Sequence, residues 1–168
     1  MGLLDGWQFC PRCQSDLVDE VGHLRCATCE ARYWANSVPG AQAVIERDGC
    51  VLLGLRRDDP GAGRWDLPGG FLDEGENAVD ALRREVLEET GLEVEPAEFL
   101  GTWNEDYWDR TVLCLTWLAH VVDGVERPGD DLTELRWFGV EDRPQGAALA
   151  FPTFDSILGL WASRYENI

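Results

Sequence analysis

The sequence feature that most constrains the fold is a glycine-rich loop that runs directly into an acidic helix. Residues 77–90 carry apolar side chains at helical spacing, and Gly91 supplies a helix stop. Three carboxylates in this helix are three and four residues apart and therefore share one face: Glu85, Glu88 and Glu89. Because like charges on one face repel, we expect a divalent cation with oxygen ligands to lie there and to bridge phosphate oxygens.

The residues around the helix favour a cation site over a plain solvated face, which is the usual meaning of a glutamate-rich helix alone. Glu76 stands where the unpaired backbone donors of a helix start favour a carboxylate. Arg84 precedes Glu88 by four residues, and we expect it to hold that carboxylate by a forked hydrogen bond. Gly69 and Gly70 allow a tight loop to pass close to the helix.

Residues 70–92 resemble the Nudix box, the signature of the Nudix hydrolase family. The matching positions are Gly70, Glu76, Arg84, Glu85, Val86, Glu88, Glu89, Gly91 and Leu92. The resemblance implies an α/β fold, the Nudix α/β/α sandwich with a mixed sheet, over residues 41–168. It also implies that the three helix glutamates bind Mg²⁺ or Mn²⁺ and that Glu85 is a candidate base. Glu76 and Arg84 would then organise the loop and the helix.

Members of the family often take a further ligand or base from outside the box. Glu134 stands in an E-x-x-W pattern before the last predicted strand and resembles that residue, although a surface glutamate would look the same. The implied reaction is hydrolysis of a diphosphate that joins a nucleoside to another group. Metal ions polarise the diphosphate and lower the pKa of a water, and a carboxylate accepts its proton.

Two C-x-x-C pairs form a second pattern near the N-terminus: Cys10, Cys13, Cys26 and Cys29. Two such pairs supply the tetrahedral thiolate set that zinc prefers. Since all four ligands come from the protein, we expect a structural zinc ion that replaces the core a short module cannot build. Two disulfides or a redox dithiol are the alternative, although the strand–helix context of a redox site is missing. Cys50 and Cys114 lie in apolar runs and are interpreted as core residues.

The chain is therefore predicted to hold two domains, a zinc ribbon over residues 1–36 and a Nudix hydrolase domain over residues 37–168. In the second domain a hairpin is expected around residues 47–49, and residues 153–165 are spaced as an amphipathic closing helix. Further strands are expected at residues 98–103, 111–122 and 135–140.

Several side chains outside the helix are candidates for holding the substrate. Arg56 and Arg64 flank the loop of Gly69 and Gly70 and are candidates for gripping a phosphate, although surface arginines would look the same. Aromatic rings near the expected mouth of the site can stack on a nucleobase, and three are available: Trp103, Tyr107 and Trp108. The alternative for the tryptophans is a place in the core.

The order of the two domains bears on the substrate. A zinc ribbon ahead of a Nudix domain is similar to the arrangement in NADH pyrophosphatases, but residues 102–110 lack the proline-rich array that those enzymes carry after the box. We therefore expect a small nucleotide of the NADH, ADP-ribose or FAD class as the substrate. Three alternatives stay open: hydrolysis of dinucleoside polyphosphates, hydrolysis of nucleotide caps, and a non-catalytic nucleotide-sensing regulator.

The bulk composition restricts the partners. The formal charge of −18, from 32 acidic and 14 basic residues, repels polyanions, so we expect no extended nucleic-acid contact. No run reaches the roughly 18 apolar residues of a membrane span, and the N-terminal residues do not resemble a signal peptide. We therefore expect a cytoplasmic protein without membrane contact, and we leave open whether it forms a homodimer.

Overall fold

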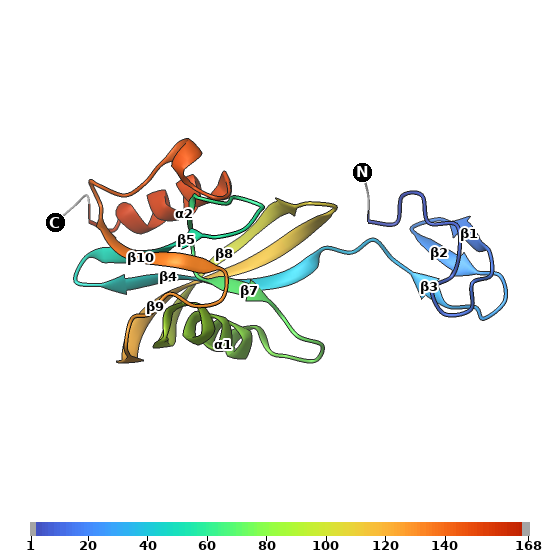
Figure 1. Cartoon of the computed structure of the whole chain (residues 1–168), viewed down its shortest axis with the longest axis horizontal. Helices are drawn as coiled ribbons and strands as arrows, with labels where there is room; N and C mark the ends of the chain where they lie inside the picture. Colours follow the sequence, from blue (N-terminus) through green and yellow to red (C-terminus); the bar gives the residue numbers. More distant parts are fainter. Residues whose placement is uncertain (1–2, 166–168) are drawn as a thin grey trace.

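The computed structural model describes residues 3–165, which form a three-stranded sheet near the N-terminus and a seven-stranded sheet after it (Figure 1). Residues 1–2 of the predicted zinc ribbon and residues 166–168 of the predicted second domain lie outside the described residues. Within the described part of the chain, no helix is both long and apolar enough to cross a membrane.

The N-terminal module is built on three short strands and has almost no apolar core. Strand β1 (Leu17–Glu20) pairs antiparallel with β2 (His23–Cys26), which pairs with β3 (Arg32–Tyr33). Among residues 3–36, Cys10 and Cys26 are the fully buried side chains. A module of this size with so little buried apolar surface needs another source of stability, such as a disulfide or a metal ion.

The larger sheet is mixed. Its main strands, in the order in which they pair, are β10 (Leu132–Gly139), β5 (Cys50–Arg56), β4 (Val38–Arg47), β9 (Arg110–Gly124) and β8 (Leu92–Tyr107). The β4–β9 pair is parallel, and its neighbours in the sheet are antiparallel. Two short strands join the sheet beside this path: β6 (Trp65–Asp66) pairs with β5, and β7 (Gly69–Phe71) pairs with β4.

Two helices cover opposite faces of the sheet (Figure 1). Helix α1 (Ala78–Thr90) buries Leu82 and Val86 on one face, and α2 (Thr153–Ala162) buries Phe154 and Trp161 on the other. Successive residues of a strand point to opposite faces, so β4 contributes to both cores. Each large side chain that is fully buried contributes about 1.5–3 kcal/mol. A short 3₁₀ turn, η1 (Gly146–Ala148), precedes α2.

Local signals explain where α1 begins and ends. The side chain of Asn77 accepts a hydrogen bond from the Val79 backbone N–H at 2.8 Å, which satisfies one unpaired donor at the helix start. Gly91 ends the helix in the left-handed conformation, with φ of 71°, and its N–H donates to the Leu87 carbonyl at 2.9 Å. The helix is therefore held at both ends beside the glycine-rich loop.

The predicted mixed sheet between helices, and with it the α/β/α fold class, is confirmed. The helix expected at residues 77–90 and the hairpin at residues 47–49 are present. The closing helix ends at Ala162 rather than Tyr165, because residues 163–165 form a turn. The strand expected at residues 98–103 is part of the much longer β8, whose pairing with β9 contains register shifts.

Candidate active site

A cavity of about 270 Å³ lies between the glycine loop, α1 and the ends of several strands. The acidic residues that line it are Asp66, Asp73, Glu85, Glu89, Glu105, Asp130 and Asp131. Arg56 is the basic residue of the lining, and aromatic rings are contributed by Phe71, Tyr107 and Phe151. Such an excess of carboxylates suits a hard divalent cation with oxygen ligands, and the rings suit a planar group.

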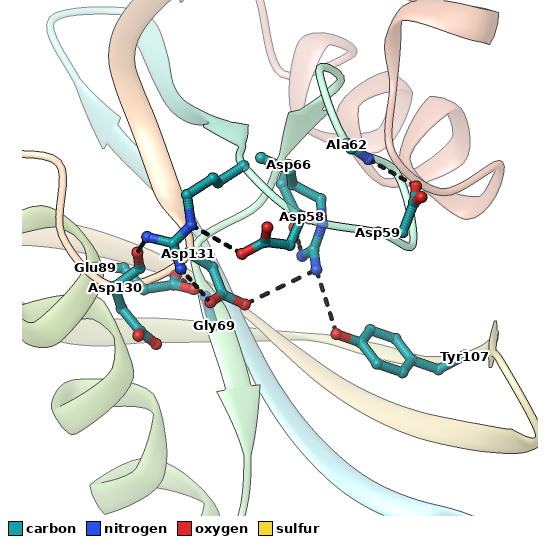
Figure 2. A network of polar contacts seen from close by, with 11 residues as sticks. Asp58, Asp59, Ala62, Asp66, Gly69, Glu89, Tyr107, Asp130 and Asp131 are labelled. Atoms are coloured by element: carbon teal, nitrogen blue, oxygen red, sulfur yellow. Dashed lines mark hydrogen bonds and ion pairs between the residues drawn. The ribbon is translucent and has the colours of Figure 1, made fainter.

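Glu89 of α1 ties the helix to the glycine loop. The residue is 5% exposed, and its carboxylate accepts a hydrogen bond from the Gly69 backbone N–H at 2.8 Å (Figure 2). Burial, together with the nearby charge of Asp66, raises the pKa of Glu89 well above its ordinary value. The ionised carboxylate is therefore unfavourable in this position until a cation lies beside it.

Arg84 organises the loop and the helix through Glu76 rather than through Glu88. Its Nε and Nη2 atoms donate to the two carboxylate oxygens of Glu76 at 2.9 and 2.8 Å. This forked bond lowers the pKa of Glu76 to about 2. Nη1 donates to Glu85 at 2.6 Å and lies 3.6 Å from Glu88. The expected fork on Glu88 is wrong, because the loop folds back and brings Glu76 to the guanidinium.

The box glutamates differ in their surroundings. A Cβ atom at position 70 would lie 2.5 Å from the carboxyl carbon of Glu85, so the absence of a side chain at Gly70 makes room for that carboxylate. Glu85 is 13% exposed at its side chain, and burial raises its pKa. Glu88 is 53% exposed and does not line the cavity. Of the three helix glutamates, Glu85 and Glu89 are therefore the ones that line the cavity.

Two aspartates from outside the box complete the acidic end of the cavity. Asp130 and Asp131 belong to the segment before β10, which is attached to the end of α1 by backbone hydrogen bonds. The N–H groups of Val125, Arg127 and Gly129 donate to the carbonyls of residues 91, 90 and 89, respectively, at 2.9–3.2 Å. These carbonyls have no partner within the helix, so the segment satisfies them while it places both aspartates beside Glu85 and Glu89.

Arg56 forms the middle of the cavity wall. It is 7% exposed, forms an ion pair with Asp66 and donates to the Tyr107 hydroxyl at 3.3 Å (Figure 2). Its Nη2 atom also lies 4.0 Å from a carboxylate oxygen of Asp131. The guanidinium therefore links the acidic end of the cavity to the aromatic end, and its charge is already shared with two acids.

The aromatic end of the cavity contains a buried carboxylate that the sequence analysis did not single out. Glu105 of β8 is 3% exposed and accepts a hydrogen bond from the Thr153 hydroxyl at the start of α2. Burial is the largest cause that raises the pKa of Glu105, to about 7. Cys114 also lines the cavity instead of serving only as a core residue, and burial raises its pKa to about 12.

Besides Glu88, four of the predicted substrate or metal residues do not line this cavity. Arg64 and Glu134 are exposed elsewhere, and Trp103 packs partly buried against the core on the α2 side. Trp108 is 73% exposed and lines a separate hollow of about 340 Å³ with residues 35–37. The predicted residues that the cavity does bring together are Glu85, Glu89, Gly69, Gly70, Arg56 and Tyr107.

Among the cavity residues that the sequence analysis missed, Glu105 had a usable signal in the sequence, whereas Asp130 and Asp131 did not. Alternate residues of a strand share a face, so a cavity position for Tyr107 also places Glu105 there. Asp130 and Asp131 follow Gly129 in an acidic turn before a strand, but a turn of this kind does not reveal its neighbours.

The N-terminal cysteines converge on one point. The sulfur atoms of Cys10, Cys13, Cys26 and Cys29 all lie within 4.8 Å of one another. The Sγ atoms of Cys13 and Cys26 are 3.4 Å apart and those of Cys10 and Cys29 are 3.7 Å apart. Tetrahedral zinc with Zn–S bonds of about 2.3 Å requires sulfur separations of about 3.8 Å. All six cysteines are free, so the structure favours a metal over the disulfide alternative.

Tyr33 supports this cluster from the third strand. Its hydroxyl lies 3.2 Å from the Cys10 sulfur, and this contact is the largest cause that lowers the pKa of Cys10 to about 6. A thiol that ionises readily is suited to metal binding, because the thiolate is the ligand.

Comparison with curated proteins finds pyrophosphatases and hydrolases. An ADP-ribose pyrophosphatase from Methanocaldococcus jannaschii is 31% identical over 116 residues, which cover 68% of this chain and 69% of that protein. An NAD-capped RNA hydrolase from Vibrio parahaemolyticus is 26% identical over 140 residues. That match covers 82% of this chain but 53% of the relative, so the chain spans about half of its length.

Comparison with solved structures and family models agrees with the geometry. The crystal structure of a Nudix hydrolase from Nitrosomonas europaea matches with a TM-score of 0.82 and 25% identity, over 96% of this chain and 94% of that one. A MutT Nudix hydrolase from Burkholderia pseudomallei is 34% identical, with a TM-score of 0.62, over 66% of this chain and 89% of that one. The model of the NUDIX domain matches residues 37–155, and this chain therefore belongs to the Nudix hydrolase family.

Proposed function

We propose that this hydrolase cleaves the diphosphate linkage of a small nucleotide in which a nucleoside diphosphate is joined to another group. The observation that carries the proposal is the cavity itself, which carboxylates and aromatic rings line together. Glu89, Asp130 and Asp131 lie on one side of it and Tyr107 on the other (Figure 2). A diphosphate with its cation fits the first side, and a nucleobase fits the second.

The proposed ligands of Mg²⁺ or Mn²⁺ are Glu85 and Glu89, with Glu88 at the solvent side of the same helix. In place of Glu134, we propose that Asp130 or Asp131 supplies the carboxylate from outside the box. A bound cation would neutralise phosphate charge and lower the pKa of the attacking water. Arg84 holds Glu85 in place through its 2.6 Å hydrogen bond.

The other residues of the cavity orient the substrate and move one proton. A carboxylate must accept a proton from the attacking water, and we propose Glu85 for this role because it lines the cavity close to the glycine loop. Phe71 and Tyr107, whose ring centres are 5.4 Å apart, provide apolar surface for the nucleoside. Arg56 keeps this wall fixed to the acidic end through Asp66 and Tyr107.

NADH-, ADP-ribose- or FAD-like nucleotides are the proposed substrates, since one relative is an ADP-ribose pyrophosphatase. A second candidate is the nucleotide cap of an RNA, which the NAD-capped RNA hydrolase relative favours. The charge of −18 opposes a long RNA track but not recognition of the cap alone. Dinucleoside polyphosphates remain a third candidate, whereas a non-catalytic regulator is disfavoured because every box glutamate is retained.

The test is a substrate panel incubated with Mg²⁺ or Mn²⁺, with products separated by chromatography. The panel contains NADH, ADP-ribose, FAD, a dinucleoside polyphosphate and an NAD-capped oligonucleotide. We expect a nucleoside monophosphate from at least one diphosphate and no product when the divalent ion is omitted. The proposal is wrong if no member of the panel is cleaved with either ion.

For the N-terminal module we propose a structural zinc ion bound by the four cysteines, and a domain boundary near residue 36. The buried cysteines and the absence of an apolar core among residues 3–36 support a structural role. Elemental analysis of the purified chain should give one zinc per chain, and sedimentation should report whether the module joins two copies. Cytoplasmic location stays an expectation.

A further inference from the structure

The buried carboxylate at the aromatic end has an oxygen that the described chain leaves without a partner. One oxygen of Glu105 accepts the Thr153 hydroxyl, whereas Oε2 has no hydrogen-bond partner among residues 3–165. A buried acceptor without a donor costs about 1–3 kcal/mol, so most such groups in proteins are paired. Glu105 also lines the cavity, which makes a bound molecule a natural source of the missing donor.

The surroundings of Glu105 describe the molecule that would supply this donor. Tyr107 lies between Phe71 and Phe151, with ring centres at 5.4 and 6.1 Å, and all three rings line the cavity. Val112 and Cys114 of the neighbouring strand complete an apolar wall. A planar heteroaromatic ring fits such a wall, and its edge must carry an N–H group for the carboxylate.

The position of Glu105 within the cavity separates it from the phosphate end. Glu105 belongs to β8, two residues from Tyr107, whereas Glu85 and Glu89 belong to α1. Arg56 lies between these groups, because it donates to the Tyr107 hydroxyl and pairs with Asp66 and Asp131. Rotation of the planar carboxylate moves both oxygens together, so the Thr153 hydroxyl that holds one oxygen also sets the direction of Oε2. Glu105 therefore lies where the base of a nucleotide would be, beyond the atoms that react.

We infer that Glu105, oriented by Thr153, is the residue that selects the nucleobase, by accepting a hydrogen bond from the exocyclic amino group of an amino-bearing base. The inference rests on the proposed function for the identity of the substrate as a nucleotide. It adds a preference that the acidic end of the cavity cannot supply, because phosphate and ribose are common to all nucleotides.

The test compares two ligands that differ in one amino group, AMP and purine riboside 5′-monophosphate. Binding is measured by calorimetry on the full chain, so the result does not depend on turnover. We expect AMP to bind on the order of 10-fold more tightly, because it makes one hydrogen bond that the other ligand lacks, and tenfold corresponds to about 1.4 kcal/mol. Equal affinity for the two ligands would overturn the inference.

Variants separate hydrogen bonding from charge and from general damage. Glu105→Gln keeps an acceptor and should retain a preference for AMP, whereas Glu105→Leu removes it and should bind both ligands equally. Thr153→Val removes the hydroxyl that holds one carboxylate oxygen of Glu105, and it should reduce the preference for AMP. Glu93→Gln changes an exposed glutamate of the same strand and serves as the control, with the preference unchanged. A preference that survives in Glu105→Leu would contradict the inference.

Hydrolysis distinguishes this inference from the proposed function. If ADP-ribose is cleaved, Glu105→Leu should raise KM on the order of 10-fold with kcat changed much less, because the lost contact is made with the base in the ground state as well. If no diphosphate is cleaved but AMP is preferred in binding, the proposed reaction fails while the base-selecting role stands.

Discussion

The four cysteines of the N-terminal module and the box glutamates are arranged in opposite ways. In the N-terminal module the four cysteine sulfurs lie within 4.8 Å of one another, and one of them contacts Tyr33. In the cavity the box glutamates form no such group among residues 3–165, and their side chains have different surroundings. Glu85 is bound by Arg84, Glu89 by the Gly69 N–H, and Glu88 is open to solvent.

This difference explains why the cysteine cluster suits a structural metal ion and the carboxylates suit a catalytic one. Four converged thiolates satisfy tetrahedral zinc and leave no coordination position for water or substrate. Carboxylates that are held apart by protein hydrogen bonds leave room for phosphate oxygens and water, which Mg²⁺ usually retains among its ligands. The first cluster therefore suits the proposed structural ion, and the second suits a cation that shares its coordination with a substrate.

Preventing the proposed zinc binding should have the largest effect, and this effect should stay within the N-terminal module. We expect Cys26→Ser to abolish zinc binding and to unfold the module, since structural zinc contributes about 10–16 kcal/mol in small zinc-binding peptides. Hydrogen exchange should rise across β1, β2 and β3 while α1 and β4 stay protected. Cys50→Ser is the matched control, and loss of protection in α1 would show that the two regions are not independent.

Changing a cavity carboxylate should abolish hydrolysis without unfolding the chain. Glu89→Gln keeps the size of the side chain but removes the charge beside the proposed cation, and we expect kcat to fall by more than about 100-fold. Steady-state kinetics on the best panel substrate measures this change, with Glu93→Gln as an exposed control in the next strand. Near-normal turnover by Glu89→Gln would remove the main support for the second site.

Weakening the fork between Arg84 and Glu76 should have a smaller effect of the same kind. Lysine keeps the charge but cannot donate to both oxygens of Glu76 and to Glu85 at once. We expect Arg84→Lys to lower kcat about 10–100-fold, as is usual for groups that orient metal ligands. Arg83→Lys, one residue earlier and bound to exposed Glu95, is the control and should keep its activity. Equal losses in both variants would contradict a specific role for Arg84.

The smallest effect should appear in stability rather than in rate. The pKa of Glu105 is raised from 4.5 to about 7 in the folded chain, so folding retains a proton that the unfolded chain releases between these values. The contribution of Glu105 to the free energy of unfolding is therefore fully present below pH 4.5 and is lost as the pH rises through about 7.

Glu105→Gln removes this dependence, since an amide does not titrate. We compare thermal melts of the variant and the parent chain without added magnesium or manganese. Between about pH 5 and about pH 8, the free energy of unfolding of the variant should rise relative to that of the parent chain by on the order of 1 kcal/mol. Asp106→Asn, an exposed neighbour, should show no such gain. A difference between variant and parent that does not change with pH would mean that burial does not perturb Glu105.

The sequence predicted those parts of the fold that local patterns determine. The acidic helix has its cap at Asn77 and its stop at Gly91, and the hairpin turn at residues 47–49 joins two apolar runs. The Nudix resemblance of residues 70–92 then led to the fold class. What the pattern could not determine was pairing over long distances. The parallel β4–β9 pair and the register shifts in β8 depend on contacts between distant segments.

The same distinction between local patterns and long-range contacts applies to the candidate site. Glu85, Glu89 and the glycine loop were predicted because they belong to one continuous motif. Arg84 was assigned to the wrong carboxylate, because helical spacing favoured Glu88 and the return of the loop to the helix was not visible. Glu134 was named as the further ligand and Asp130 and Asp131 were not considered, because the attachment of the segment that carries these aspartates to α1 appears only in three dimensions.

That attachment has a consequence for how the site can change. Three N–H groups of residues 125–129 donate to the carbonyls at the end of α1, so the segment that carries the aspartates is tied directly to the helix that carries the glutamates. An insertion between β9 and Gly129 can lengthen the connection without altering the acidic end, provided that these three hydrogen bonds re-form. A single inserted residue between Gly129 and Asp130 would instead displace both aspartates relative to the helix glutamates, and we expect it to disrupt the proposed cation site.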